Sequence, residues 1–290
     1  MLEKVAIVTV IYSDPIDQFR DFINSLKKIK KPDFELILVN NDSRIDWLES
    51  ETKSFPSVKI IESGKNLGFC AGSNLGVRLA LKNGANRIIL LNGDTSVLPN
   101  ILQSLLKYQS ENPKAGVITP IIISADKDHQ IYYAGGIINK ILGFTRNRYF
   151  GRKFNGQKIK SGKTDSASGC CMLVTKEVFE KIGLLDENYF MYFDDPDFSL
   201  RAQKLGFEVH LLALPLVCHL KSSNKLSTSA AYYYGRNPFI MIWKNFRWYF
   251  KPTAYIGQFI IRLPRNVFRL KDFSAFGYYL AGVYDGVRGK

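Results

Sequence analysis

The chain has 290 residues, 46% of them hydrophobic, which is enough for one large domain or two small ones with a sizeable core. Its formal net charge is +14, and residues 236–290 alone hold ten Lys and Arg against two Asp, an excess of +8. Positive charge gathered at one end suggests a polyanionic partner, either an acidic membrane surface or nucleic acid. No window reaches ~18 uninterrupted apolar residues, so we expect no membrane-spanning helix.

Four short apolar runs rich in β-branched residues are typical of strands buried on both faces. They are residues 5–11, 34–39, 58–61 and 87–91. Segments with apolar side chains at helical spacing separate them, which predicts an α/β fold with a mostly parallel sheet flanked by helices. Polar residues follow the runs, among them Asp14, Asp42, Asn66 and Asp94. Ligands bind at the carboxyl ends of strands in such sheets, so we expect these polar residues to converge on one crevice. Each of them, taken alone, also fits an ordinary turn.

The second half of the chain is less regular. Residues 124–165 predict loops and short strands over the sheet. Further elements are expected as strands at residues 168–174, 207–212 and 216–219, with a helix at 176–182. From Ser227 the pattern is helical and aromatic, so we expect a main domain over residues 1–225 and a basic helical extension over 226–290.

The cysteines and the amino terminus bear on the cellular compartment. The four cysteines, Cys70, Cys170, Cys171 and Cys218, form no CxxC pair and no zinc-finger spacing. Reduced, buried thiols in a cytoplasmic protein are the simplest interpretation. The chain starts a strand pattern almost at once, without the basic and then apolar arrangement of a signal peptide, so we expect a cytoplasmic location.

An acidic stretch lies within residues 190–201, behind a run of aromatic residues. Its carboxylates are Asp194, Asp195 and Asp197. Pro196 is favoured in the first turn of a helix, which places Asp195 at the N-cap of a helix running to about Lys204. Aromatic walls beside clustered carboxylates also raise the pKa of one carboxyl group until it can act as a base. From this stretch alone, helix capping and catalysis remain equally open.

Two further places offer metal ligands. Asn92 and Asp94 are two apart at a strand end, so both side chains can face the same way. One carboxylate, one amide oxygen and water suit Mg²⁺ or Mn²⁺, while a turn built on Gly93 explains the same residues without a metal. His219, just past an apolar run, is a second candidate ligand, although a lone His in such a place is more often structural.

The carboxyl-terminal region has a basic amphipathic pattern. The apolar face consists of Ile256, Phe259, Leu263, Val267 and Leu270, and the basic face of Arg262, Arg265 and Arg269. We expect a kink near Pro264 and weigh an acidic membrane surface evenly against simple packing on the main domain. Nucleic acid is disfavoured because no recognisable binding module accompanies the charge.

Several short motifs follow one another over roughly residues 5–245. They are Val-Thr9-Val-Ile-Tyr12, Asn40-Asn41-Asp42-Ser43, Asn66-Leu-Gly68-Phe with Gly72 and Asn74, Leu-Leu-Asn92-Gly-Asp94, Ser168-Gly169-Cys-Cys-Met-Leu, Gly183-Leu-Leu-Asp186-Glu, Phe190-Met-Tyr192-Phe-Asp194-Asp195-x-Asp-Phe-Ser-Leu-Arg201, His219 and Arg236-Asn237. In this order they resemble the motifs of an inverting glycosyltransferase of family 2 with the GT-A fold, and most closely those of its rhamnosyltransferase-like branch. The resemblance implies a nucleotide-sugar-binding and catalytic domain over residues 1–225.

The resemblance also implies roles for these positions. The nucleotide-sugar site would comprise Thr9, Tyr12, Asp14, Asn41, Asp42, Asn66, Gly68, Gly72, Asn74, Asn92 and Asp94, with Asp14 and Asp42 on the base and ribose. Asp94 and His219 would hold Mg²⁺ or Mn²⁺ on the diphosphate. Asp195 would be the general base and Asp194 its partner. The acceptor side would comprise Ser168, Gly169, Tyr192 and Arg201.

This sequence departs from the family pattern twice. Gly93 fills the middle of a metal motif that is usually Asp-x-Asp or Asn-Pro-Asp, and Asp194-Asp195 replaces the usual Glu-Asp. The implied donor is a UDP- or dTDP-sugar such as dTDP-rhamnose, and the implied acceptor a saccharide or lipid-linked hydroxyl at the cytoplasmic face of a membrane. A homodimer stays open. The alternatives are a non-catalytic nucleotide-sugar-binding protein at a membrane surface and a sugar-phosphate nucleotidylyltransferase, although the latter's basic Gly-rich loop near the amino terminus is absent.

Overall fold

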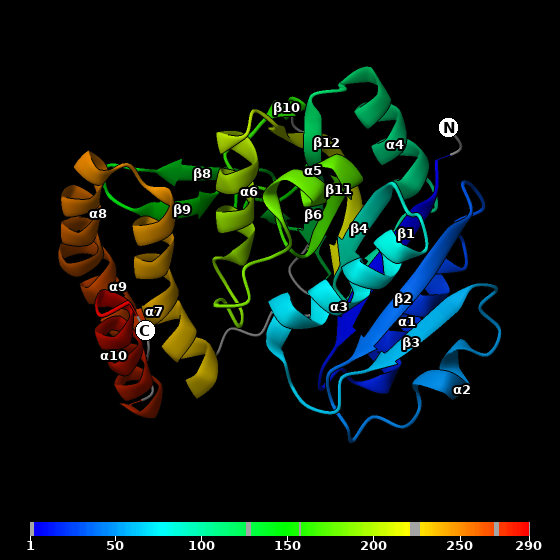
Figure 1. Cartoon of the computed structure of the whole chain (residues 1–290), viewed down its shortest axis with the longest axis horizontal. Coiled ribbons are helices and arrows are strands. Elements are labelled where there is room, and N and C mark those ends of the chain that lie inside the picture. Colours follow the sequence, from blue (N-terminus) through cyan, green and yellow to red (C-terminus); the bar gives the residue numbers. More distant parts are fainter. Residues whose placement is uncertain (1–2, 126–128, 157, 221–226, 270–272, 290) are drawn as a thin grey trace.

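The computed structural model describes residues 3–125, 129–156, 158–220, 227–269 and 273–289 (Figure 1). The strands are β1 (Val5–Ile11), β2 (Phe34–Asn40), β3 (Val58–Glu62), β4 (Arg87–Leu91), β5 (Thr95–Val97), β6 (Ala115–Ser124), β7 (Ile131–Tyr133), β8 (Gly136–Asn139), β9 (Phe144–Asn147), β10 (Gly162–Lys163), β11 (Cys171–Thr175) and β12 (Glu208–His219). The α-helices are α1 (Ile16–Leu26), α2 (Leu48–Thr52), α3 (Gly68–Lys82), α4 (Ile101–Glu111), α5 (Lys176–Ile182), α6 (Asp194–Lys204), α7 (Thr228–Asn245), α8 (Lys251–Gly257), α9 (Leu263–Arg269) and α10 (Phe273–Val287).

One mixed sheet organises the molecule, in the order β3-β2-β1-β4-β11-β6-β12-β10, with β5 on β12 and β7 on β6. The first four of these strands are parallel, and β11 runs antiparallel to both β4 and β6. The prediction of a mostly parallel α/β sheet flanked by helices, with helices at the carboxyl-terminal end, is confirmed. The two short strands expected at 207–212 and 216–219 are wrong: β12 is one strand whose pairing with β6 slips around Pro215. Proline cannot donate to the ladder, so the irregularity falls there.

The two faces of the sheet carry separate cores. Side chains of Ile7 and Ile11 pack with Phe19 and Phe22 of α1, whereas Val8 on the other face packs with α3. Helix α3 approaches β1 closely because Gly76 has no side chain: an added Cβ would overlap Val8. Figure 1 shows α3 crossing in front of the parallel strands.

The start of α6 differs from the prediction. The helix begins at Asp194, and the residue before it, Phe193, has a left-handed backbone with φ of 67°. Asp195 is therefore in the first turn and is not the N-cap. Pro196 tolerates the third helical position because the first four N–H groups of any helix lack an intrahelical partner.

The carboxyl-terminal helices gather at one end of the molecule (Figure 1). Ile240 and Ile242 of α7 belong to the same core cluster as Phe198 of α6, so α7 is continuous with the main core. Helix α10 packs on α7 through glycines, since a Cβ on Gly282 would overlap the carbonyl oxygen of Tyr232. A π-helical turn over Gln258–Arg262 immediately precedes Pro264.

The predicted boundary at 225/226 falls in residues 221–226, outside the described part of the chain, and the division into two parts stays a prediction. Within the described residues no helix is long and apolar enough to cross a membrane.

Candidate active site

One edge of the sheet collects most of the predicted site residues. The carboxyl ends of β1, β2 and β4 lie there because the three strands are parallel. Strand β11 runs the other way, with Cys171 opposite Leu91, so its amino end brings Ser168 and Gly169 to the same edge. His219 ends β12 opposite Thr95, one residue after Asp94. Segments up to two hundred residues apart in sequence therefore meet at this edge.

Asp42 occupies the β2 end of the edge, in a charged network. Nε of Arg44 donates to Oδ1 of Asp42 at 2.8 Å, a terminal nitrogen of the guanidinium donates to Oδ2 at 2.6 Å, and the Ser13 hydroxyl donates to Oδ2 at 3.2 Å. These hydrogen bonds, first those from Arg44, hold the pKa of Asp42 well below its usual range. Asp42 is thus a permanent anion whose position is set by Arg44. The sequence did not point to Arg44, because an arginine in a polar loop is unremarkable.

Asp14 lies beside the β4 loop. Its Oδ2 accepts a hydrogen bond from the backbone N–H of Tyr12 at 2.9 Å, and it approaches Gly93, where a Cβ would lie 3.6 Å from it. Burial raises the pKa of Asp14 to about 6, and the charge of Asp94 adds to the rise against the opposing Tyr12 hydrogen bond. Tyr12 itself is exposed at this edge. A side chain at Gly93 would overlap Ile11, at 2.7 Å, so the tight packing that requires glycine there is against β1.

The Asn66–Gly72 segment is joined to β2 and to the acidic loop. The Asn41 amide nitrogen donates to the Gly68 carbonyl at 2.9 Å, and a Cβ on Gly72 would lie 2.8 Å from that nitrogen. The Asn66 side-chain oxygen accepts a hydrogen bond from the Gly68 N–H. Gly68 has a positive φ of 77°, a backbone conformation that suits glycine. Within the described residues, the buried Oγ1 of Thr9 and Oδ1 of Asn41 have no hydrogen-bond partner. Both residues are buried at this edge, so these two polar oxygens are unsatisfied inside the protein.

Asn74 is directed elsewhere. Its amide exchanges hydrogen bonds with the Leu185 backbone, at 2.9 and 3.0 Å, and donates to Glu187 at 2.9 Å. The side chain is buried and ties α3 to the loop before the acidic stretch. These contacts favour a structural role for Asn74 over a contact with the nucleotide sugar.

Asp94 and His219 form the pair that could hold a metal. Nε2 of His219 lies 3.3 Å from Oδ2 of Asp94, while Oδ1 of Asp94 is buried without a hydrogen-bond partner among the described residues. In that part of the chain no group of three or more His, Cys, Asp or Glu could hold a metal by itself. Mg²⁺ and Mn²⁺ often take one or two protein ligands and complete their shell with phosphate oxygens and water. The donor set fits such a cation, with Asn92 half-buried in the same loop.

Tyr132 was not predicted and lies between the two halves of the site. Its ring stacks on His219, with centroids 4.5 Å apart and planes 16° from parallel. Burial raises the pKa of the Tyr132 hydroxyl, and the charges of Asp94 and Asp195 both act on it. The buried thiol of Cys170 lies near the same two carboxylates. Tyr132 lies on β7, a short strand in the irregular middle of the chain, so no local sequence pattern could have identified it.

Asp194, which is buried, and Asp195, which is half-buried, form a carboxylate pair at the start of α6. Oδ2 of Asp195 accepts the backbone N–H of Gly169 at 3.2 Å. Burial raises the pKa of Asp195 to about 6 in spite of that hydrogen bond. Burial and the charge of Asp195 raise the pKa of Asp194 well above its usual value. Two adjacent carboxyl groups cannot both ionise easily, so the charge of each one opposes ionisation of the other.

The remaining acceptor-side candidates divide into two groups. Ser168 and Gly169 lie beside the carboxylate pair, and Tyr192 is exposed with its ring edge-on to Tyr234. Arg201 is instead committed to the protein interior. Its Nε donates to the buried Asp197 at 2.8 Å and its other nitrogens donate to the Ile182 and Leu184 carbonyls. These contacts support a structural role for Arg201.

The sequence pattern of glycosyl transferase family 2 matches residues 6–183, more than half of the chain. The chain therefore belongs to glycosyl transferase family 2.

Two named relatives are rhamnosyltransferases. The dTDP-rhamnosyl transferase RfbF of Shigella flexneri is 26% identical over 255 residues, covering 84% of this chain and 82% of the relative. The N-acetylglucosaminyl-diphospho-decaprenol L-rhamnosyltransferase of Mycobacterium tuberculosis is 25% identical over 226 residues, covering 71% and 73%.

Solved structures share the fold. Staphylococcus aureus TarS (residues 1–349) superposes with a TM-score of 0.64 at 12% identity, over 98% of this chain and 81% of TarS. GalNAc-T7, determined with UDP, GalNAc and Mn²⁺, superposes with a TM-score of 0.67 at 13% identity, over 96% of this chain and 55% of its own. The fold of this chain is accordingly GT-A.

Proposed function

We propose that the protein is an inverting glycosyltransferase that moves a sugar from a UDP- or dTDP-sugar to a hydroxyl group of a saccharide or lipid-linked acceptor during cell-surface polysaccharide synthesis. The observation that carries the proposal is the meeting of the Asp94–His219 pair with Asp195 around Tyr132 at one edge of a GT-A sheet. A leaving-group site and a base must lie on either side of the reacting carbon, and this arrangement provides both.

The nucleotide would bind at the β1 and β2 ends of the edge. Asp42, fixed by Arg44, and Asp14 offer acceptors for the N–H and hydroxyl groups of a base and ribose. Oγ1 of Thr9 and Oδ1 of Asn41 are further polar atoms without partners in the described part of the chain. GalNAc-T7, which shares the fold, was determined with UDP. The name of the Shigella relative makes dTDP-rhamnose one candidate donor.

The diphosphate would bind at Asp94 and His219 through Mg²⁺ or Mn²⁺. A cation bound there supplies positive charge to the diphosphate leaving group. Asp94 and His219 would hold it, and the stack of Tyr132 on His219 fixes the imidazole plane. The side-chain oxygen of Asn92 is close enough in sequence to contribute a water-mediated contact.

Asp195 would be the general base. Its carboxylate accepts the proton of the acceptor hydroxyl as that oxygen forms its bond to the anomeric carbon, while the bond from that carbon to the diphosphate oxygen breaks. A single in-line displacement inverts the configuration and needs no covalent intermediate. The Gly169 N–H holds Oδ2 of Asp195, and a pKa of about 6 leaves the base ionised yet basic at pH 7. Asp194 lies beside it, and its raised pKa disfavours a second negative charge in the site.

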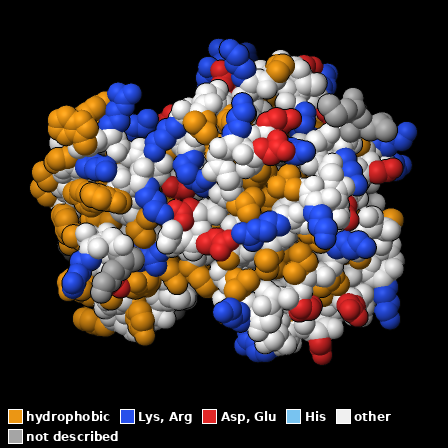
Figure 2. Space-filling view, viewed as in Figure 1, with side chains coloured by type: hydrophobic (Ala, Val, Ile, Leu, Met, Phe, Trp, Pro, Cys, Tyr) orange, Lys and Arg blue, Asp and Glu red, His pale blue; other side chains and the backbone are white. Residues whose placement is uncertain are grey.

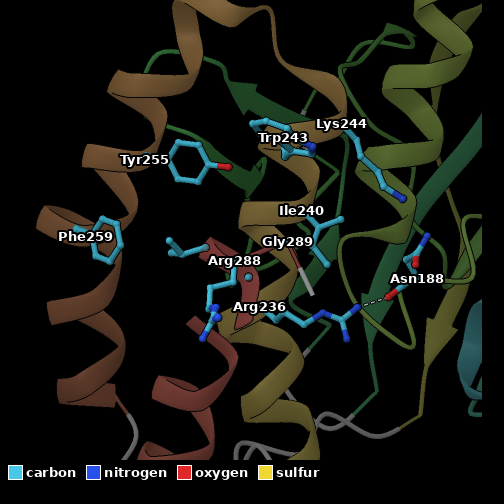
Figure 3. Close-up of a pocket in the computed structure, with 11 residues that line it drawn as sticks. Asn188, Arg236, Ile240, Trp243, Lys244, Tyr255, Phe259, Arg288 and Gly289 are labelled. Atoms are coloured by element: carbon cyan, nitrogen blue, oxygen red, sulfur yellow. Dashed lines mark hydrogen bonds between the residues drawn. The ribbon is translucent and has the colours of Figure 1, made fainter. Parts of the chain in front are cut away.

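The carboxyl-terminal helices would attach the enzyme to an acidic membrane at its cytoplasmic face. Large apolar side chains are exposed there, including Trp243, Trp248, Ile256, Ile260, Phe273 and Tyr284. Figure 2 shows hydrophobic side chains gathered over these helices with Lys and Arg among them. A cavity of about 710 Å³ lies among these helices. Figure 3 shows its aromatic residues Trp243, Tyr255 and Phe259 together with the basic residues Arg236, Lys244 and Arg288 around it. Amphipathic surfaces of this kind suit an interface of acyl chains and anionic headgroups.

Calorimetric titration of UDP and dTDP, with and without Mn²⁺, tests the nucleotide and metal assignments. We expect Mn²⁺-dependent binding of one nucleotide, which weakens at least tenfold in Asp94→Ala. An Asp17→Ala variant is a matched control, because Asp17 is exposed at the start of α1. Absence of binding under every condition would remove the support for a nucleotide-sugar enzyme. Binding without sugar transfer to any acceptor would favour a non-catalytic nucleotide-sugar-binding protein.

A further inference from the structure

A second cavity, of about 490 Å³, lies beside the β8–β9 hairpin. Four of its lining residues are arginines: Arg146 of β9, Arg148 and Arg152 of the following segment, and Arg265 of α9. The other lining residues are Ile137, Asn147, Tyr149 and Phe150. None of the lining residues described is an Asp or Glu. The cavity is therefore a strongly positive hollow to which the β8–β9 hairpin, the segment that follows it and helix α9 contribute.

These arginines differ from four others that each form an ion pair with a carboxylate. Arg20, Arg44, Arg78 and Arg201 each have a carboxylate partner, at 2.7, 2.6, 3.0 and 2.8 Å. Within the described part of the chain, no ion pair involves any of the four cavity arginines. Gathering like charges around one hollow is electrostatically unfavourable, and a bound anion reverses that. The guanidinium fork matches a phosphate group with paired hydrogen bonds.

The arginine-bearing segment is held firmly on the sheet. The Arg148 N–H donates to the Gly135 carbonyl at 2.8 Å, and Ile131 of β7 donates to the Arg152 carbonyl at 2.8 Å. The Gly151 N–H donates to the Ile131 carbonyl at 2.9 Å. Backbone bonds on both sides of the segment set where its side chains can reach. The segment that carries Arg148 and Arg152 is thus fixed against β7, while Arg146 lies on β9 and Arg265 on α9.

Aromatic contacts connect this cavity to the candidate active site. Phe150, on its lining, packs edge-on against Tyr132 with ring centroids 6.3 Å apart, and Tyr132 stacks on His219. The cavity is on the β6–β7 side of the sheet, whereas Asp42 is on the β2 side. The contacts through Tyr132 therefore join the cavity to the Asp94–His219 pair, and the charge of Asp195 also acts on Tyr132. The cavity lies away from the β2 end of the edge, where Asp42 is found.

We propose that the arginine cavity binds the diphosphate that links the acceptor sugar to a lipid, which orients a sugar hydroxyl toward Asp195. This inference rests on the proposed function and adds to it a location and a chemistry for the acceptor. Tyr149 and Phe150 would pack against the sugar or the first lipid carbons beside the diphosphate. The cavity binds this diphosphate without a metal, because the guanidinium groups supply the positive charge.

Binding of farnesyl diphosphate to the full chain in EDTA tests the proposal, because chelation removes the metal from the Asp94–His219 pair. The paired variant Arg146→Gln/Arg152→Gln and the single variant Arg265→Gln remove cavity charge from two different elements. A matched control, Lys82→Gln/Arg247→Gln, removes the same net charge from exposed positions outside the cavity. Farnesol and inorganic pyrophosphate separate the contribution of the lipid from that of the phosphate, and thermal unfolding confirms that each variant is folded.

We expect the paired cavity variant to weaken farnesyl diphosphate binding about tenfold or more, since each charge-assisted hydrogen bond is worth about that factor. The control should stay within about twofold, and farnesol should not bind measurably. Equal losses of farnesyl diphosphate affinity in the paired cavity variant and the control would overturn the assignment of the arginine cavity as the binding site. Tighter binding of inorganic pyrophosphate than of farnesyl diphosphate would overturn the lipid-linked source.

The test separates this proposal from the proposed function. If Mn²⁺-dependent UDP or dTDP binding persists in the cavity variant while farnesyl diphosphate affinity is unchanged from wild type, the acceptor inference fails and the transferase proposal stands. If neither nucleotide binds to the wild type while the arginines still govern farnesyl diphosphate affinity, the transferase proposal fails and the anion site stands.

Discussion

Asp42 and Asp195 are carboxylates at two ends of the same sheet edge, and the structure treats them in opposite ways. Asp42 is bound by the Arg44 guanidinium, which lowers its pKa below the usual range. Asp195 lies half-buried beside a second carboxyl group, and burial raises its pKa to about 6. An anion that must hold a ligand needs a fixed charge, whereas a base needs affinity for a proton. The comparison shows that the surroundings of one residue type shift its pKa in opposite directions, which matches the two roles that the proposed function gives to Asp42 and Asp195.

Replacement of Asp195 should have the largest effect. In Asp195→Asn we expect kcat to fall by about 10²–10⁴ because the group that accepts the proton is gone. Donor affinity should be unchanged, as measured by calorimetry with the nucleotide and Mn²⁺. In Asp42→Asn we expect the reverse pattern, in which the KM for the donor rises while kcat stays nearly normal. Loss of donor affinity in Asp195→Asn would show that the two roles are misassigned.

The pH profile should distinguish the two carboxylates next. Asp195 must be ionised to accept a proton, so kcat at saturating donor should fall about tenfold per unit below pH 6 and level off above pH 7. Asp42 stays ionised throughout that range because its pKa is lowered. A kcat that stays constant from pH 7 down to pH 5 would exclude Asp195 as the base.

Asp14 provides a test on stability. Its pKa is raised from 3.8 to about 6, so the folded protein binds the proton more tightly than the unfolded chain does. Stability contributed by protonated Asp14 is therefore present below about pH 4 and is lost as the pH rises through about 6, by about 1–3 kcal/mol. Asp14→Asn should raise the melting temperature at pH 7.5 in EDTA. The same variant at pH 4 should show a smaller gain, and equal gains at both pH values would contradict the assignment.

Arg44 should give the smallest change. Arg44→Gln removes the main hydrogen bonds that lower the pKa of Asp42, so that carboxylate becomes easier to protonate and less well positioned. We expect donor affinity to fall by about two- to fivefold at pH 7 and by more at pH 5. Arg20→Gln, which also breaks a surface ion pair, is the control and should leave donor affinity unchanged. An equal effect at both pH values would mean that Arg44 acts on the nucleotide directly.

Local patterns in the sequence were enough for the parallel half of the sheet. Apolar runs, helical spacing and polar clusters recur within short windows, and the carboxyl ends of parallel strands must share an edge, so Asp14, Asp42 and Asp94 could be grouped in advance. The acidic stretch was recognised for the same reason, although its N-cap was misplaced because proline tolerates any first-turn position.

Tertiary structure alone decided the rest of the candidate site. Tyr132 reaches Asp94 and Asp195 only because β7 pairs with β6, and the arginine cavity forms only where the hairpin meets α9. Asn74 and Arg201 look like ligand-binding residues in sequence, yet their contacts are with Leu185 and Asp197 inside the protein. The physical reason is range: strand and helix periodicity is set by neighbouring residues, whereas burial, charge pairing and pKa depend on segments that only the folded chain brings together.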